Sequence, residues 1–422
     1  MQLGQTYHKT VLDNGIRVVS EEIEHVRSVS IGIWIQCGSC YEDHETNGAA
    51  HFIEHMLFKG TDRRSAFDIA SEIDSVGGVM NAFTGKELTS YYIKVPDYHF
   101  PLAIDLLADI IQKSRFQAEE INREKSVILQ EISMLEDSPD DYVHDFFESV
   151  FWGDHPLGLN ILGTKDQILR LNRESLLSFF HARYRGDDLV LAAAGHLKHD
   201  ILVDMVQEAF RSMEKETSRM IIGPPEVKSG MAVLEKDLEQ VHIVMGTLAP
   251  SATNPKRFPC FLLNAVLGGS MSSRLFQEIR EKRGLAYAIH SYLVPYADVG
   301  QMGIYAGTGE GQARIVVDLI EDELKRLCNE KLTEKEIHGA KELIKGNFLL
   351  SMESTDNRMM RLAKNELSFG KHIPPEDVIR QIDAVVSEDV RELACELYDS
   401  RVLSIVAIGK VSEKDIALNR RQ

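Results

Sequence analysis

The two halves of the chain repeat one order of elements, and this duplication limits the possible folds more than any other feature of the sequence. An apolar run closed by glycine, residues 188–197, ends the first half, and a similar run, residues 402–411, ends the second. Each run follows a segment of helical period, residues 174–184 and 388–398. We therefore expect two domains of about 200 residues with the same topology.

Each half mixes short strands of period two with helices of period 3.6, and the strands occur in runs. This order is typical of an α+β fold in which helices cover a mainly antiparallel sheet. Gly223, Pro224 and Pro225 can continue neither a helix nor a central strand. We predict two homologous α/β sandwich domains related by internal duplication, residues 1–216 and 233–422, joined by a linker at residues 217–232.

The charge of the chain excludes several partners. Asp and Glu number 65 against 47 Lys and Arg, which gives a net charge of −18. Nucleic acids and anionic membranes select basic surfaces, so neither is an expected partner. No apolar run approaches the roughly 20 residues of a membrane-spanning helix, and the N-terminus lacks the apolar stretch of a signal peptide. The five cysteines fit reduced thiols, so we predict a cytoplasmic location; Cys37 and Cys40 are predicted to lie in a turn.

The strongest chemical signal is the run His51-Phe52-Ile53-Glu54-His55. On a helix, the two histidines lie about 40° apart around the axis, so both imidazoles can bind one ion. Glu54 lies about 60° to the other side of His51, where its carboxylate can take a proton from metal-bound water without binding the ion. Two imidazoles with an open position for water suit zinc.

Two histidines leave such a site one ligand short. Glu124 and Glu131 are seven residues apart, about two helical turns, and therefore share one face of a predicted helix. One of them would bind the ion, and the other would orient a ligand or water; the spacing does not decide which. The alternative is a plain surface helix, because solvated helices also carry histidines four apart and many glutamates.

The histidine motif is the inverted zinc motif of inverzincins, and with its surroundings it resembles the pitrilysin/insulysin-like metallopeptidases. The match is closest to the bacterial processing proteases and the β subunit of mitochondrial processing peptidase, and it extends over essentially the whole chain. The resemblance implies that His51, His55 and Glu131 bind one Zn²⁺, that Glu54 is the general base, and that Glu124 is a supporting catalytic carboxylate. Residues 1–216 would then be the zinc-binding catalytic domain, and residues 233–422 a non-metal domain supplying substrate-binding residues.

Two further segments acquire roles from this resemblance. Residues 77–92 combine a glycine turn with two strand-like runs, which predicts a β-hairpin. The resemblance implies that this hairpin offers a sheet edge to an extended substrate through Asn81, Ala82 and Phe83. It also implies that Arg280 and Tyr287 join the active site, where arginine holds a carbonyl and tyrosine donates to the oxyanion. Without the resemblance, that segment would be interpreted as a charged helix end with a buried tyrosine.

We therefore predict a zinc-dependent endopeptidase of the processing-protease type, which hydrolyses short or unfolded peptides with metal-bound water activated by Glu54. The alternative is a catalytically silent scaffold or partner subunit of the same fold, which the complete motif disfavours. The second half carries no counterpart of the motif, so one Zn²⁺ per chain is expected. Relatives with four such domains close a chamber around their substrates. With two domains, this chain is expected to form a closed chamber as a homodimer.

Overall fold

The computed structural model of the chain describes residues 6–215, 222–227, 229–398 and 403–419. Contacts between residues divide the chain into two compact units. Unit 1 consists of Met1–Ser133, Leu159–Ile222 and Ser351–His372. Unit 2 consists of Met134–Gly158, Gly223–Leu350 and Ile373–Gln422.

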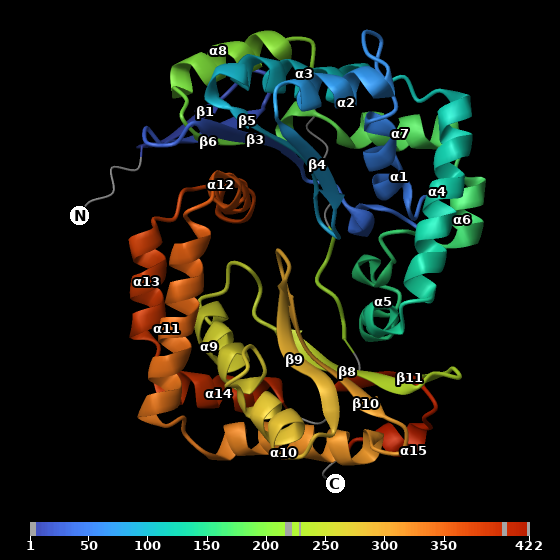
Figure 1. The fold of residues 1–422 in the computed structure, drawn as a ribbon, viewed down its shortest axis with the longest axis vertical. Helices are drawn as coiled ribbons and strands as arrows, with labels where there is room; N and C mark the ends of the chain where they lie inside the picture. Colours follow the sequence, from blue (N-terminus) through green and yellow to red (C-terminus); the bar gives the residue numbers. More distant parts are fainter. Residues whose placement is uncertain (1–5, 216–221, 228, 399–402, 420–422) are drawn as a thin grey trace. The chain divides into compact units, whose positions relative to one another are not determined.

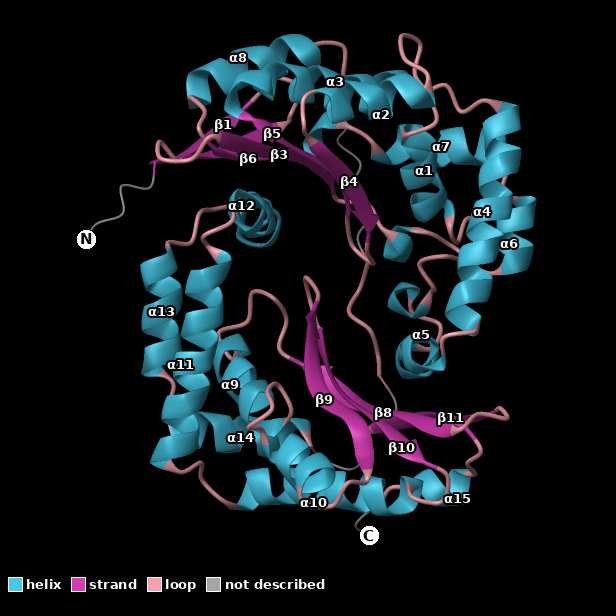
Figure 2. Ribbon diagram, viewed as in Figure 1, coloured by secondary structure: helices cyan, strands magenta, loops and turns pink. Residues whose placement is uncertain are grey.

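The sheet of unit 1 has six strands in the order β1-β2-β6-β3-β5-β4 (Figure 2). Strands β2 and β6 pair in parallel, and the other neighbours pair antiparallel. The order places β4 at one edge, next to the elements that carry the candidate site. The strands are β1 (Thr6–Val11), β2 (Arg17–Glu22), β3 (Ser28–Ile35), β4 (Val79–Thr84), β5 (Thr89–Pro96) and β6 (Leu189–Gly195).

The sheet of unit 2 repeats this topology with five strands in the order β7-β11-β8-β10-β9. Strands β7 and β11 are parallel, and the remaining neighbours are antiparallel, as in the series β2-β6-β3-β5-β4. The predicted α+β fold with mainly antiparallel sheets and an internal duplication is therefore confirmed. The strands are β7 (Met231–Glu235), β8 (Gln240–Ala249), β9 (Ala286–Pro295), β10 (Gly300–Gly309) and β11 (Ser404–Gly409).

Helices cover both faces of the unit 1 sheet, and this explains the continuous apolar run in β6. Leu189, Leu191 and Ala193 face the main core, whereas Val190 and Ala192 face a second, smaller core. A strand buried on both faces has no solvent side for polar residues. Figure 1 shows α3 and α8 over the face that borders the main core and α12 over the face that borders the smaller core. The helices of unit 1 are α1 (Ala49–Leu57), α2 (Ala66–Ser75), α3 (Phe100–Lys113), α4 (Ala118–Glu136, whose last turn enters unit 2), α6 (Lys165–Arg170), α7 (Arg173–Arg183), α8 (His199–Ala209) and α12 (Thr355–Phe369).

Helix α12 comes from the second half of the sequence but packs on β2, β3 and β6 of unit 1. Met359 and Leu362 contribute to the smaller core, and a hydrogen bond from Ser30 to Asp356 (2.6 Å) joins the helix to β3. Lys94 adds an ion pair to Asp356 (2.8 Å). These contacts explain why α12 belongs to unit 1.

Helix α5 (Pro139–Trp152) comes from the first half of the sequence and packs on β8 and β11 of unit 2. The two units therefore differ from the predicted domains at α5 and α12, because each sheet covers its second face with a helix from the other half. The predicted linker at residues 217–232 lies partly outside the described residues. The other helices of unit 2 are α9 (Arg257–Leu267), α10 (Ala313–Asn329), α11 (Glu334–Ser351), α13 (Pro375–Ala384), α14 (Ser387–Leu397) and α15 (Glu413–Ile416).

Among the described residues, no helix combines the length and the apolar character that crossing a bilayer requires. The cytoplasmic location stays a prediction from the sequence.

The packing of α5 in unit 2 generates a prediction about pH. His144 of α5 is hydrogen-bonded to the hydroxyl of Tyr292 (2.9 Å). Burial, helped by the neighbouring His290, lowers the pKa of His144 to about 4, although Asp140 and Asp141 oppose the shift. The folded protein then keeps His144 neutral where the unfolded chain binds a proton. The free energy of unfolding should therefore fall as the pH drops from about 6.5 to 4, by at most about 3 kcal/mol from this residue.

Urea unfolding at several pH values measures this effect. His144→Gln should lose less stability than the wild type between neutral pH and about pH 5, because glutamine does not titrate. His25→Gln is the matched control, since His25 is exposed and belongs to unit 1. Equal pH dependence in the wild type and His144→Gln would contradict the assignment.

Candidate metal centre

Helix α1 carries the histidine motif, and its apolar side anchors it in the core of unit 1. Phe52, Ile53, Met56 and Leu57 are buried, whereas both histidines remain partly exposed. The helix begins after Gly48, whose φ of 90° favours a residue without a Cβ atom. The motif therefore lies on a short helix with a fixed orientation.

A buried carboxyl group caps the N-terminus of α1. Glu42 Oε2 accepts hydrogen bonds from the backbone N–H of Gly48 and from the side-chain amide of Asn47, both at 2.8 Å. Glu42 Oε1 accepts from the backbone N–H of Ala50 at 2.6 Å. Burial raises the pKa of Glu42 to about 8, although these three hydrogen bonds act to lower it. Glu42 thus satisfies donors that a helix N-terminus otherwise leaves unpaired.

Helix α4 brings a third potential donor, Glu131, close to the two histidines. Ile121, Ile128 and Ile132 are buried and fix the helix on unit 1. Glu131 Oε2 lies 3.7 Å from His51 Nε2 and 3.6 Å from His55 Nε2. Of the two glutamates that spacing left as alternatives, Glu131 is therefore the one placed to bind the ion.

The three side chains fit a metal ion. One donor atom from each of His51, His55 and Glu131 lies within 4.8 Å of the others, and the described part of the chain contains no second group of this kind. The Oε2 atom of Glu131 is buried and has no hydrogen-bond partner, which is costly unless a cation binds there. Two imidazoles and one carboxylate form a donor set typical of catalytic Zn²⁺.

Glu124 contacts His55 through Nδ1, the ring nitrogen that does not face Glu131. Its Oε2 accepts a hydrogen bond from His55 Nδ1 (3.0 Å), and its Oε1 pairs with Lys59 Nζ (2.7 Å). Burial acts to raise the pKa of Glu124, but the contacts with His55 and Lys59 hold it below its usual value. An ionised Glu124 keeps the Nδ1 proton of His55 in place and leaves Nε2 to bind a metal.

Glu54 lies on the same helix but is not one of the three converging donors. Its Oε2 accepts a hydrogen bond from the hydroxyl of Thr84 at 2.5 Å. Burial raises the pKa of Glu54; Thr84 and His55 oppose this shift, and the negative charge of Glu131 adds to it. A carboxylate with a raised pKa is a stronger base, which suits the role predicted for Glu54.

Strand β4 carries the predicted substrate-binding residues along a sheet edge. The predicted hairpin is confirmed: β4 pairs antiparallel with β5, and β4 ends the sheet on its other side. Asn81 is exposed, Ala82 is half-buried, and Phe83 is 36% exposed. Helix α1 packs against β4, so this edge lies next to the metal motif.

Arg280 and Tyr287 belong to unit 2. Arg280 lies in a π-helical turn, η5 (Phe276–Glu281), and Tyr287 lies near the start of β9. The guanidinium carbon of Arg280 lies 4.7 Å from the ring centre of Phe276 and 4.9 Å from that of Tyr287. Tyr287 is 77% exposed, so the alternative interpretation with a buried tyrosine is wrong. The aromatic ring of Tyr287 is thus presented on the surface of unit 2, with Arg280 stacked against it.

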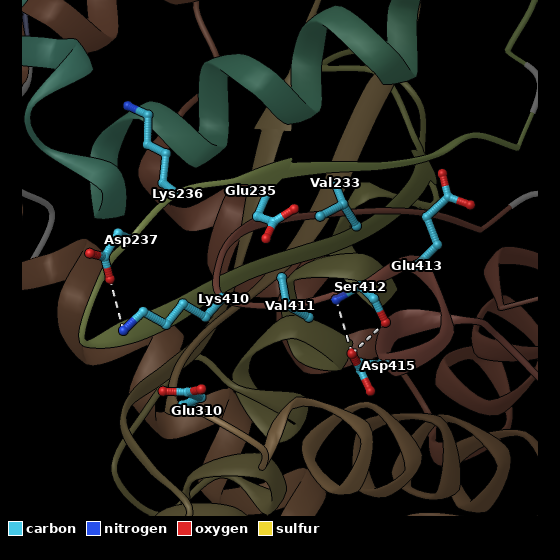
Figure 3. A pocket seen from close by; sticks show the side chains of 10 residues that line it. All are labelled: Val233, Glu235, Lys236, Asp237, Glu310, Lys410, Val411, Ser412, Glu413 and Asp415. Carbon is cyan, nitrogen blue, oxygen red and sulfur yellow. Dashed lines mark hydrogen bonds and ion pairs between the residues drawn. The ribbon is translucent and has the colours of Figure 1, made fainter.

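A large polar pocket of about 1000 Å³ lies in unit 2, beside β7 and the segment that joins β11 to α15 (Figure 3). Several of its charged side chains already have partners. Lys410 contacts Asp237 at 2.8 Å, and Asp415 accepts hydrogen bonds from the backbone N–H and the hydroxyl of Ser412. These pairs have structural roles, and the pocket therefore supplies no candidate as strong as the cluster on α1 and α4.

The sequence did not predict three residues that contact the site. Glu42 contacts the N-terminus of α1, Lys59 contacts Glu124, and Thr84 contacts Glu54. The sequence offered a signal only for the first, because α1 begins at a glycine without a side chain to cap it. The other two contacts join elements far apart in the chain and follow no local pattern.

Comparison with known proteins places this geometry in a family. Residues 17–165 match the family described as "Insulinase (Peptidase family M16)", and residues 170–344 match "Peptidase M16 inactive domain". The metal cluster lies in the part of the chain matched by the first description. The second description agrees with the absence of another such cluster among the described residues.

Relatives match over nearly the full length. An uncharacterized zinc protease of Bacillus subtilis is 42% identical over 385 residues, which cover 91% of this chain and 94% of that protein. An uncharacterized zinc protease of Streptomyces coelicolor is 40% identical over 417 residues, 97% of this chain and 91% of that protein. The crystal structure of a protease from Helicobacter pylori has a TM-score of 0.90 at 21% identity, covering 96% of this chain and 99% of that chain, and supports the fold.

The cap of α1 generates a prediction about stability. Glu42→Gln replaces a carboxyl group whose two oxygens accept three hydrogen bonds by an amide whose NH₂ group can accept none. We expect the free energy of unfolding to fall by about 1–3 kcal/mol, as urea denaturation measures. Glu45→Gln, at an exposed position nearby, should leave stability unchanged. Equal stability of the Glu42→Gln and Glu45→Gln variants would contradict the capping role.

Proposed function

Because the chain belongs to peptidase family M16, the insulinase family, we propose that it is a zinc-dependent endopeptidase that hydrolyses short or unfolded peptides, as processing proteases do. One observation carries this proposal. One donor atom from each of His51, His55 and Glu131 lies within 4.8 Å of the others, and the carboxylate of Glu54 is carried by the same helix as the two histidines. This is the constellation that metal-assisted hydrolysis requires.

Zinc is the cofactor that the residues and the relatives favour. His51, His55 and Glu131 would hold the ion, and the similar bacterial proteins are named zinc proteases. When bound, Zn²⁺ polarises the carbonyl of the scissile peptide bond and makes water more acidic. Glu124 fixes the orientation of the His55 ring through Nδ1, and Lys59 keeps Glu124 in place.

Glu54 handles the protons of the reaction. Its carboxylate takes a proton from the attacking water, whose oxygen forms a bond to the carbonyl carbon. Glu54 then delivers this proton to the amide nitrogen as the C–N bond breaks, which leaves an amine and a carboxylic acid. The acid gives its remaining proton to the amine, so the final products are an ammonium group and a carboxylate. The raised pKa of Glu54, caused mainly by burial, supports its role as the base in the first of these steps.

The edge of β4 supports the choice of substrate. An unpaired strand edge presents backbone donors and acceptors to any extended peptide, largely independent of sequence. Asn81, Ala82 and Phe83 lie along this edge and would contact the residues around the scissile bond. A peptide must be extended to add a strand here, so short or unfolded chains fit better than folded proteins.

We further propose that the chain acts as a homodimer enclosing a chamber, in which Arg280 and Tyr287 complete an active site. Arginine would hold a substrate carbonyl, and the tyrosine hydroxyl would donate to the oxyanion. The exposure of Tyr287 and its stacking with Arg280 support a role at a surface that faces substrate.

A catalytically silent scaffold would not need these features. A protein without activity does not require the three donors, the Glu54 carboxylate and the Glu124 carboxylate to lie close together. All five side chains are present, and their positions favour the peptidase.

Removal of the base tests the proposed function. Glu54→Gln should lower kcat for a quenched peptide substrate by at least about 100-fold, because the amide cannot accept the proton. The variant should still bind one zinc ion per chain by metal analysis, since Glu54 is not among the three donors. Glu119→Gln, at an exposed position on α4, should retain activity. A chelator should abolish wild-type cleavage, and added Zn²⁺ should restore it. Cleavage that survives the Glu54→Gln substitution or the chelator would defeat the proposal.

A mixing experiment tests the dimer. If the site is shared between subunits, an Arg280→Ala chain and a Glu54→Gln chain are each inactive alone but regain part of the activity when combined. The mixed dimer then contains one site with an intact base and an intact arginine. Sedimentation measures whether dimers form, and failure to regain activity in mixed dimers would count against a shared site.

A further inference from the structure

We propose that Thr84 is a positioning residue, which holds the carboxylate of Glu54 in register with the peptide strand bound along β4. This inference rests on the proposed function of Glu54 as general base. It adds a residue that links the substrate-binding edge to the proton-transfer group.

The contact between the two side chains is direct. Thr84 Oγ1 donates to Glu54 Oε2 at 2.5 Å. Within the described part of the chain, no other hydrogen bond to the Glu54 side chain is seen. Thr84 therefore fixes one carboxylate oxygen and leaves Oε1 to accept the proton of the attacking water.

The hydroxyl of Thr84 has little freedom, because the hairpin around it is closed. Thr84 is the last residue of β4 and pairs with Thr89 at the start of β5. The N–H of Gly85 donates to the carbonyl of Leu88 at 2.8 Å and closes the turn between them. Thr89 Oγ1 donates to the carbonyl of Cys37 at 2.8 Å, which ties the hairpin to the segment before α1, and lies 3.4 Å from Thr84 Oγ1.

That segment holds the hairpin and α1 together. The N–H groups of Ser39 and Cys40 donate to the carbonyls of Gly85 and Lys86, at 3.1 and 2.9 Å. A Cβ atom at Gly38 would overlap the carbonyl oxygen of Gly85, so the close approach requires glycine. The predicted turn that carries Cys40 thus contributes backbone donors to the loop between β4 and β5, and its two cysteines are buried.

The same stretch of chain continues to Glu42, which caps α1. One segment thus fixes the helix that carries Glu54 and the strand that ends in Thr84. A peptide added to the edge of β4 takes its register from that strand. Thr84 therefore fixes the position of the Glu54 carboxylate relative to the scissile bond. Loss of the hydroxyl should slow the chemical step much more than it weakens peptide binding.

The test compares variants in the zinc-loaded protein. Thr84→Val keeps the shape of the side chain but removes the hydroxyl, and we expect kcat to fall about 10-fold or more with KM nearly unchanged. Thr84→Ser restores the donor and should recover most of kcat. Thr61→Val is the matched control: it removes a buried threonine hydroxyl of unit 1 that donates to a carboxylate, Asp109 Oδ2 at 2.7 Å, rather than to Glu54. It should lower stability without the same loss of kcat.

The outcomes separate this inference from the proposed function. If the wild type cleaves peptide and Glu54→Gln does not, then full kcat in Thr84→Val overturns the role of Thr84 alone. A fall in kcat that Thr84→Ser does not rescue also overturns it, because only the hydroxyl is invoked. Inactive wild-type protein overturns the proposed function and, with it, this inference.

A second readout needs no turnover. Urea unfolding of Thr84→Val, Glu54→Ala and the double variant forms a double-mutant cycle for the hydrogen bond. The two single substitutions should lower the unfolding midpoint non-additively, because either one breaks the same contact. Additive shifts would show that the contact does not form in solution and would overturn the inference, whatever the activity.

Discussion

Glu42 accepts hydrogen bonds from the first turn of α1 while the apolar side of that helix is buried in the core of unit 1. Because both restraints act on one short helix, His51 and His55 are held before any metal binds. The third donor arrives on α4, which is anchored by its own row of buried isoleucines. The candidate metal centre therefore lies where two anchored helices pack together, and little conformational entropy would be lost on binding an ion.

The same helix connects the metal donors to the groups that would handle substrate and protons. Glu124 and Lys59 support His55 from behind, and Thr84 contacts Glu54 from the edge strand. Each contact satisfies a polar group that burial would otherwise penalise. The polar network is thus part of the folded core of unit 1 and also fixes the chemistry, so substitutions within it change stability and reactivity together.

The two sheets share one topology over five strands, but the two units differ in their functional side chains. The metal cluster lies in unit 1, while unit 2 presents an arginine stacked on an exposed tyrosine. Each sheet also covers its second face with a helix from the other half of the sequence, α12 in unit 1 and α5 in unit 2. Each sheet would therefore leave one face uncovered without a helix from the other half of the sequence. We infer that the two halves depend on each other to fold.

Local periodicity and spacing in the sequence predict the element order, the strands with continuous apolar runs and the helix that carries His51, Glu54 and His55. The sequence shows these features because each depends on neighbouring residues. It also narrowed the third ligand to two glutamates on one helix face. Only the tertiary structure distinguished Glu131, which faces both imidazoles, from Glu124, which supports one of them. It alone showed that α5 and α12 pack on their sheets and that Thr84 contacts Glu54. An amphipathic pattern shows that a face is buried, but the partner that buries it depends on contacts between residues far apart in the chain.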